Sequence, residues 1–301
     1  MQIAVTGSSG LIGTALIAAL RGSGHQAIPV VRPESAASGE SLHWDPNAGT
    51  IDTAGFEGID AVVHLAGVGI GDKRWTDEQK QRILQSRVVP TTLLAETLAG
   101  LARPPAVLVS GSAVGWYGAR GSEVLTEASP PPNPSDFAAD VCRRWEAATT
   151  PAEAAGIRTV HLRTGIVLAR AGGVLPRMAL PVKLGLGGRI GSGKQYMSWI
   201  ALEDEIGAIL HAINTASLNG PLNATAPTPV TNAEFTAALG HVLKRPTILP
   251  TPVPALKVVY GSELVDHLLV EGQRVVPDQL EATGFTFTHT GLDDALRAVL
   301  R

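Results

Sequence analysis

The sequence predicts an α/β fold built on a doubly wound parallel sheet and followed by a smaller C-terminal α/β domain. Short apolar runs bounded by glycine and polar residues alternate with stretches of helical period, which is typical of a parallel sheet covered by helices on both faces. After Gly165 the chain changes to glycine-rich loops and more widely spaced helices. This change of character indicates that a second, less regular unit follows the sheet.

Five apolar runs are predicted as the strands of that sheet: Ile3–Thr6, Ala27–Val31, Ala61–Leu65, Ala106–Ser110 and Thr159–Arg163. Four stretches between and after them have helical period: Leu11–Leu20, Val88–Leu98, Ser135–Ala155 and Leu202–Ile213. Gly22 and Gly24 end the first helix as a C-terminal cap requires. Thr231 and Glu234 have the spacing of a capping box, which predicts a further helix running to Leu243.

The predicted domains are a nucleotide-binding unit at 1–165 and a smaller substrate unit at 166–301, with part of 196–230 returning to the first. The formal net charge of −3 disfavours nucleic acid and anionic membranes as partners. Cys142 is the single cysteine, so an intramolecular disulfide and a thiolate metal cluster are excluded. The histidines show no metal-ligand spacing, so no metal is expected. Without a leader or a membrane-spanning apolar run, we expect a cytoplasmic protein.

A glycine motif lies directly between the first predicted strand and the first predicted helix. It reads Thr6-Gly7-Ser8-Ser9-Gly10-Leu11-Ile12-Gly13. Gly7 can make the tight turn, Gly10 lets the backbone approach a pyrophosphate, and Gly13 permits close packing of the helix on the strand. The unpaired N–H groups at the start of the helix favour phosphate. The position of the motif therefore predicts a dinucleotide-binding site of the Rossmann type.

The end of the second predicted strand distinguishes between the two nicotinamide cofactors. Proteins that bind NAD usually place an acidic residue there, which holds the ribose hydroxyls. This chain has Arg32 at that point, and a guanidinium can bind a 2′-phosphate in a bidentate manner. NADP(H) is therefore expected in preference to NAD(H). The alternative is that Arg32 is an ordinary solvated surface residue.

Together with His64-Leu65-Ala66-Gly67, these residues resemble the extended short-chain dehydrogenases/reductases. Further motifs make the chain similar over essentially its whole length to an atypical group called epimerase family proteins, which end in a small uncharacterised domain: Asp72–Thr76, Ser110–Gly118, Cys142–Glu146, Leu162–Gly165, Gly191–Gly193 and Glu271–Arg274. By that resemblance, the cofactor pyrophosphate would contact the residues of the glycine motif, namely Gly7, Ser8, Ser9, Gly10, Leu11, Ile12 and Gly13. Leu65, Ala66 and Gly67 would contact the adenosine side. Ser110, Thr164, Gly165 and Val167 would lie beside the nicotinamide and its ribose.

The resemblance also implies a catalytic tyrosine and a lysine four positions later, and both are absent. Phe137 and Val141 occupy their places, and neither can transfer a proton. Ser112 and Tyr117 are the remaining candidates for a catalytic hydroxyl, with Ser110 an alternative to Ser112 because the register is uncertain. Tyr117 could equally pack beneath its loop with its hydroxyl bonded to the protein.

Other chemically active side chains near these motifs have ordinary structural interpretations. Cys142 is expected to be a small buried residue, and His64 a hydrogen-bonded core histidine. Lys73 and Arg74 could bind an anionic substrate or be solvated loop residues.

The residue expected to bind a substrate pyrophosphate in nucleotide-sugar enzymes is also missing. Met197 stands where an arginine would follow the Gly191–Gln195 turn, and Lys194 or Arg189 could compensate only partly. A nucleotide-sugar substrate is therefore disfavoured. Two functions stay open: an NADP(H)-dependent oxidoreductase or epimerase-like enzyme acting on an unidentified small molecule, and a non-catalytic NADP(H)-binding regulator, which includes a role in cell division.

Overall fold

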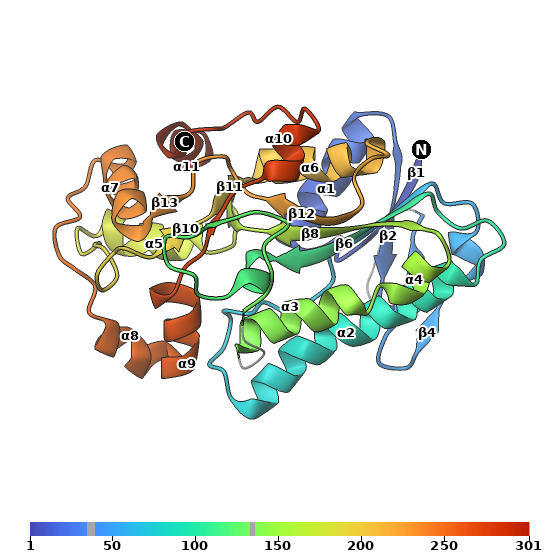
Figure 1. The fold of residues 1–301 in the computed structure, drawn as a ribbon, viewed down its shortest axis with the longest axis horizontal. Coiled ribbons are helices and arrows are strands. Elements are labelled where there is room, and N and C mark those ends of the chain that lie inside the picture. The colour runs from blue at the N-terminus through green and yellow to red at the C-terminus, as the bar shows by residue number, and fades with distance from the viewer. Residues whose placement is uncertain (35–39, 133–135, 301) are drawn as a thin grey trace.

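A computed structural model describes residues 1–34, 40–132 and 136–300, and Figure 1 shows a central twisted sheet with helices on both faces and a smaller unit at one end. The sheet has eight strands in the order β12-β8-β6-β5-β1-β2-β3-β4. Their bounds are β1 Gln2–Thr6, β2 Gln26–Val31, β3 Leu42–Asp45, β4 Thr50–Ile51, β5 Ala61–His64, β6 Val107–Ala113, β8 Arg158–Thr164 and β12 Gly220–Ala224. All neighbouring pairs are parallel except β3 with β4.

The strand order confirms the predicted doubly wound sheet. From β1 the chain builds outward through β2 to one edge and then returns to build through β5, β6 and β8 to the other edge. The carboxyl ends of β1 and β5 therefore border the point where the winding changes direction, which is where ligands bind in open sheets of this kind. The five predicted strands are present, and β3, β4 and β12 extend the sheet beyond them.

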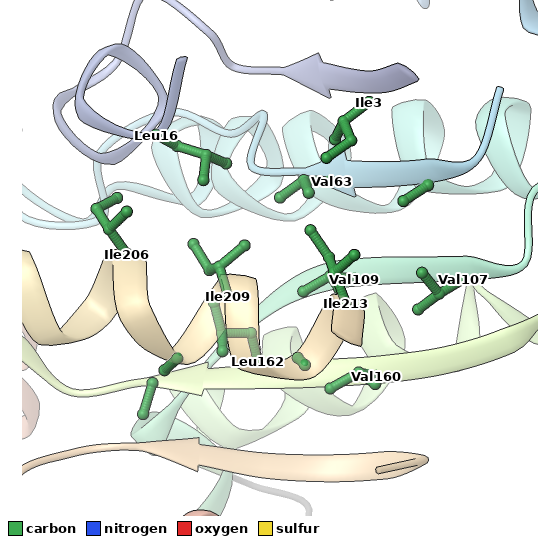
Figure 2. Close-up of a cluster of buried hydrophobic side chains, with 14 of the residues drawn as sticks. Ile3, Leu16, Val63, Val107, Val109, Val160, Leu162, Ile206, Ile209 and Ile213 are labelled. Carbon is green, nitrogen blue, oxygen red and sulfur yellow. The ribbon is translucent and has the colours of Figure 1, made fainter. Parts of the chain in front are cut away.

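Two layers of helices cover the sheet. One face carries α1 (Leu11–Gly22) and α6 (Leu202–Asn214), and the other carries α2 (Asp77–Ala99), α3 (Phe137–Ala147) and α4 (Thr150–Ala154). Figure 2 shows the core under the first layer, where side chains of the helices pack on alternate residues of the strands. The helices contribute Leu16 of α1 and Ile206, Ile209 and Ile213 of α6, and the strands contribute Ile3, Val63, Val109, Val160 and Leu162. The intervening strand residues face the second layer, because side chains alternate along a strand.

Two helices differ from their predicted extents. The helix expected at Val88–Leu98 begins at Asp77, where the side chain of Thr76 accepts a hydrogen bond from the Gln79 N–H at 3.1 Å. The helix expected at Ser135–Ala155 divides into α3 and α4, and Ser135 itself lies outside the described residues. At the division, the backbone N–H of Thr149 donates to the carbonyl of Glu146, three residues back, at 3.1 Å, and the Thr149 hydroxyl donates to the same carbonyl.

The smaller unit has its own core, in which Trp199, Phe235 and Leu296 are buried. Its elements are β9 Ile166–Leu168, α5 Leu175–Lys183, β10 Tyr196–Met197, β11 Trp199–Ala201, β13 Val230–Thr231, α7 Asn232–Leu243 and α11 Leu292–Leu300. The predicted capping box at the start of α7 is present. The division of the chain at residue 165 stays a prediction. α6 and β12, which follow that residue, belong to the layer that covers the central sheet and to the sheet itself.

The last segment before α11 packs back on the large unit. It contains α8 Val253–Tyr260, α9 Ser262–Val265, a π-helical turn η3 at Asp266–Val270, β14 Arg274–Val275 and α10 Asp278–Ala282. β14 pairs with β7 (Val124–Leu125), and Lys80 of α2 forms an ion pair with Glu263 of α9 at 3.1 Å. In the described parts of the chain, no helix combines the length and the apolar character needed to cross a bilayer.

Candidate functional site

A cavity of about 850 Å³ opens at the carboxyl ends of β1, β2 and β5, beside the first half of α2. Six of the sequence-predicted cofactor residues line it: Gly7, Ser8, Ser9, Arg32, Ala66 and Gly67. The rest of the wall includes Trp44 and Asn47 on the side of β3, and Ser86 and Val89 on the side of α2. The cavity thus lies at the switch point of the sheet, where the glycine motif is also found.

The glycine motif has the geometry of a phosphate cradle. Gly7 has a φ of +65°, and a Cβ there would lie 2.7 Å from the carbonyl of Leu65. A Cβ at Gly13 would lie 2.2 Å from the carbonyl oxygen of Gly7, so the helix can approach the strand only without a side chain. Gly10 is the N-cap of α1, provides no capping side chain, and no acidic residue lies in the first turn. The N–H groups at the start of α1 therefore stay available for an anion.

Arg32 follows the end of β2 and is exposed at the cavity wall near Trp44 and Asn47. Within the described residues, no hydrogen bond or ion pair holds its guanidinium. A bidentate partner such as a phosphate group would therefore not have to displace an existing contact.

The residues predicted to lie beside the nicotinamide do not line the cavity. Ser110 is buried in β6, and its hydroxyl has no partner among the described residues. Thr164 donates to Glu205 Oε1 at 2.8 Å, and Gly165 lies so close to Ser198 that a Cβ would come within 2.4 Å of its carbonyl oxygen. Val167 lies in β9 against the core under α1 and α6. The role of these residues beside the nicotinamide stays a prediction.

Ser112 and Tyr117 belong to a buried polar network rather than to the cavity wall. The hydroxyl of Ser112 donates to Glu146 Oε1 at 2.6 Å, and Arg163 donates to both oxygens of the same carboxylate at 2.9 Å. The Tyr117 hydroxyl donates to Asn223 Oδ1 at 2.7 Å and accepts from Arg163 Nη1 at 3.0 Å. Desolvation raises the pKa of Tyr117, and Arg163 offsets part of that increase. Both hydroxyl protons are therefore committed within the protein, so catalysis by either residue would require the network to rearrange.

Phe137 and Val141 lie in an apolar cluster with Trp75, Ile83 and Leu264. The rings of Trp75 and Phe137 meet edge to face, with centroids 4.9 Å apart. No proton-transfer group therefore replaces the expected tyrosine and lysine at these two positions.

Cys142 and His64 have the structural environments that their sequence contexts suggest. Burial raises the pKa of the Cys142 thiol to about 12, so the reactive thiolate is suppressed. His64 is hydrogen-bonded to Thr6 and Thr91, and burial lowers its pKa to about 4. Arg74 donates to the carbonyls of Val258 and Val259 in α8 and thus connects its loop to the C-terminal segment.

Several polar groups near Phe137 were not foreseen. His267 of η3 stacks on Trp75 with centroids 5.9 Å apart, and its Nδ1 lies 2.8 Å from Glu271 Oε2. Asp136 brings a carboxylate oxygen close to both, and the three groups lie within 4.8 Å of one another. Because Asp136 and His267 are far apart in sequence, no spacing rule could have paired them. The expectation that the protein binds no metal stays a prediction.

The Gly191–Gln195 turn offers few charges for substrate binding. Met197 is buried in the core of the small unit, where its sulfur accepts a hydrogen bond from Asn232. Arg189 donates to the carbonyl of Ser192 at 2.7 Å. Gln195 donates to the carbonyls of Ile190 and Leu269 and so joins the turn to η3.

Residues 3–224 match the model of the NAD dependent epimerase/dehydratase family. The chain belongs to this family. Residues 251–299 match a domain of unknown function, DUF1731, which covers the segment that packs against α2. The chain is 46% identical over 297 residues to an epimerase family protein of Mycobacterium bovis, with 98% of this chain and 96% of that protein covered.

Two solved structures extend the comparison. The crystal structure of human epimerase family protein SDR39U1 (isoform 2) with NADPH has a TM-score of 0.90 and 34% identity, covering 99% of both chains. A structure described as the nucleoside-diphosphate sugar epimerase from Corynebacterium glutamicum has a TM-score of 0.83 and 37% identity, covering all of this chain and 58% of that one. The sheet, the covering helices and the C-terminal segment of this chain are therefore similar to those of the human structure, which is matched over 99% of this chain.

Proposed function

We propose that this protein binds NADP(H) at the cavity beside the glycine motif and reduces, oxidises or epimerises a small molecule. The observation that carries the proposal is the combination of a side-chain-free phosphate cradle with an unpaired arginine at the end of β2. The cradle fits the diphosphate of any dinucleotide, whereas the arginine favours the one that carries a 2′-phosphate. The NADPH in the human relative supports the same preference.

When bound, the nicotinamide supplies or accepts the hydride, and the chain's own residues bind and orient the reactants. The glycine motif would hold the diphosphate that joins the two nucleosides of the cofactor, and Arg32 would hold the 2′-phosphate on the adenosine ribose. The apolar cluster around Trp75 and Phe137, which includes Leu264 of α9, would provide an apolar wall next to α3. A charge that develops on a substrate oxygen needs a hydrogen-bond donor beside such a wall, and Ser112 and Tyr117 stay the candidates for that donor.

The substrate we propose is a small molecule without a nucleotide. The position expected to hold an arginine for a substrate diphosphate is Met197, whose side chain is buried in the small unit. The Corynebacterium glutamicum relative is named a nucleoside-diphosphate sugar epimerase, so the panel of test compounds should include UDP-sugars. The cytoplasmic location stays a prediction.

A non-catalytic NADP(H)-binding regulator is the second candidate. It is favoured by the apolar environment of Phe137 and Val141 and by the internal hydrogen bonds of Ser112 and Tyr117. Such a protein would bind the cofactor and change its contacts with a partner without turnover.

Cofactor turnover distinguishes the two candidates. The purified protein is incubated with NADPH or NADP⁺ and panels of carbonyl compounds, alcohols and UDP-sugars, and the cofactor absorbance is followed. A matched Gly10→Val variant, which should not bind the cofactor, measures background reaction. Turnover in the native protein alone supports the enzyme. Tight binding of NADPH with no turnover of any compound supports the regulator, and no binding of either cofactor contradicts both.

A further inference from the structure

Arg87 of α2 is a mostly buried cation beside the cofactor cavity. Its guanidinium lies over the Trp145 ring, 5.0 Å from the centroid, and its Nη1 donates to the carbonyl of Ile83 at 3.1 Å and to Ser86 Oγ at 3.4 Å. In the part of the chain that the structure describes, no carboxylate forms an ion pair with it. Desolvation accordingly lowers the pKa of Arg87.

An unpaired guanidinium in such a place is costly. Removing a charge from water costs several kcal/mol unless another charge and hydrogen bonds replace the solvent. For the buried Arg163 of the same chain, this cost is offset by an ion pair, because both oxygens of Glu146 accept hydrogen bonds from its guanidinium. Arg87 has only two neutral acceptors and an aromatic ring. Its missing counter-ion is therefore expected to come from outside the protein.

The position of Arg87 indicates which anion that is. A Cβ built on Gly67 would lie 3.5 Å from Cγ and Cζ of Arg87, so the arginine occupies the space beside this glycine. Gly67 and Ser86, which flank Arg87, line the same cavity as Gly7, Ser8 and Ser9. β5 pairs directly with β1, and the segment that follows β5 runs next to the glycine motif, because a Cβ at Gly7 would lie 2.7 Å from the carbonyl of Leu65. An anion in the phosphate cradle would be the nearest external partner for the guanidinium.

We propose that Arg87 is the counter-ion of the cofactor diphosphate, a cation supplied by α2 in addition to the helix N-terminus of α1. The proposal rests on the proposed binding of NADP(H). It assigns Arg87 a task different from that of Arg32. Arg32 selects the 2′-phosphate, whereas Arg87 binds a group common to NADPH and NADH. The nearby carboxylate of α3, Glu146, is already bound to Ser112 and Arg163 and forms no ion pair with Arg87 within the described residues.

The test is calorimetric titration of the native protein, Arg87→Met and the control Arg103→Met with four ligands: NADPH, NADH, adenosine 2′-monophosphate and inorganic pyrophosphate. Arg103 is an exposed arginine near Glu57, away from the cavity lining. We expect Arg87→Met to weaken NADPH and NADH by the same factor of about 10 to 100, which corresponds to about 1.4–2.7 kcal/mol. Adenosine 2′-monophosphate lacks the diphosphate, so its affinity should not change, and pyrophosphate binding should be lost.

Thermal unfolding without ligand separates this role from a structural one. If Arg87 has no counter-ion until an external anion binds, Arg87→Met removes an uncompensated buried charge. The melting temperature of the variant without ligand should then be unchanged or higher. If Arg87 served only to support the packing of α2 on α3, the same change would lower it. A folded Arg87→Lys variant, which keeps the charge but loses the planar fork, should bind NADPH with intermediate affinity.

The possible failures can be told apart. Equal NADPH affinity of the native protein and a folded Arg87→Met variant overturns the role of Arg87 and leaves the proposed function standing. A lower melting temperature together with weaker binding of all four ligands also overturns it, in favour of a structural role. If the native protein binds neither NADPH nor NADH, the proposed function fails. Pyrophosphate binding that Arg87→Met abolishes would then still support an anion site at Arg87.

Discussion

Arg32 is the residue on which we propose that the preference for NADP(H) depends. Its guanidinium is exposed at the cavity wall and has no partner in the described residues. We expect the native protein to bind NADPH at least about tenfold more tightly than NADH, a difference of about 1.4 kcal/mol. Arg32→Ala should remove this difference while NADH affinity stays the same. Calorimetric titration of both cofactors measures it, and equal affinities in the native protein would contradict the assignment.

Glu146 is the residue that holds the buried network together. It accepts from Ser112 and twice from Arg163, and all three side chains are buried. Glu146→Gln leaves the Arg163 charge without its partner, so we expect a loss of about 3–5 kcal/mol in the free energy of unfolding. Tyr117→Phe removes only one hydrogen-bonded hydroxyl and should cost about 1–3 kcal/mol. Urea denaturation measures both, and a neutral effect of Glu146→Gln would show that the ion pair does not form.

The network also shows the limit of sequence interpretation at this scale. Glu146, Arg163 and Tyr117 each lie in a motif that the sequence singles out. Their convergence depends on the pairing of β6 with β8 and on the packing of α3 over β6, which no local pattern encodes. The sequence therefore singled out Ser112 and Tyr117 as candidate catalytic hydroxyls, and that role stays a prediction. It did not predict that the hydroxyls bond to Glu146 and Asn223.

At the scale of elements, Gly10 and Gly13 belong to the same turn but serve different purposes. A Cβ at Gly10 would meet only the Gly7 carbonyl oxygen, at 3.2 Å, whereas one at Gly13 would meet the same atom at 2.2 Å. We expect Gly10→Val to abolish NADPH binding with little change in stability, because the new side chain fills the phosphate space. Gly13→Val should instead lower the melting temperature, because α1 can no longer pack on β1.

Circular dichroism melts and NADPH titration of the two variants provide the comparison. Gly10→Val serves as the folded control for Gly13→Val, since the substituted side chain is identical. Retained NADPH binding in Gly10→Val would show that the phosphate binds elsewhere.

The elements that could be predicted are those with a clear period and a clear boundary. Buried strands such as β1 and β5 are continuous apolar runs, and α7 begins at a capping box. β12 has the sequence Gly-Pro-Leu-Asn-Ala and is buried at its centre and end. Its glycine, proline and asparagine interrupt the apolar pattern from which a buried strand is predicted. The first half of α2 is polar, because the C-terminal segment rather than the sheet covers much of it. Sequence periodicity indicates a helix that packs on a continuous apolar core. It does not indicate a polar helix that is covered by a segment from elsewhere in the chain.

Over the whole molecule, two buried titratable groups make stability depend on pH in opposite directions. His64 has a folded pKa of about 4 against an ordinary 6.5, so the unfolded state binds the proton first and stability falls as the pH decreases from 6.5 to 4. Glu205 has a folded pKa of about 8 against 4.5, so the folded state holds a proton that the unfolded state releases. Its contribution is therefore lost as the pH rises from 4.5 to 8.

Glu205→Gln tests the second effect. Glutamine keeps the acceptor for Thr164 and cannot ionise, so the variant should be more stable than the native protein at pH 8 and differ less at pH 5. Thermal unfolding at the two values measures the difference. An identical difference at both would show that Glu205 does not hold its proton in the folded state.

The position of β12 in the sheet has a consequence for how the chain acquires its fold during synthesis. β12 and α6 follow residue 201, yet β12 covers the outer edge of β8 and α6 covers the apolar face of the strands made earlier. A nascent chain that ends near residue 165 therefore exposes both an unpaired strand edge and an uncovered apolar surface. Such species associate readily with one another. Until α6 and β12 have emerged from the ribosome, the nascent chain would thus be prone to aggregation or chaperone capture.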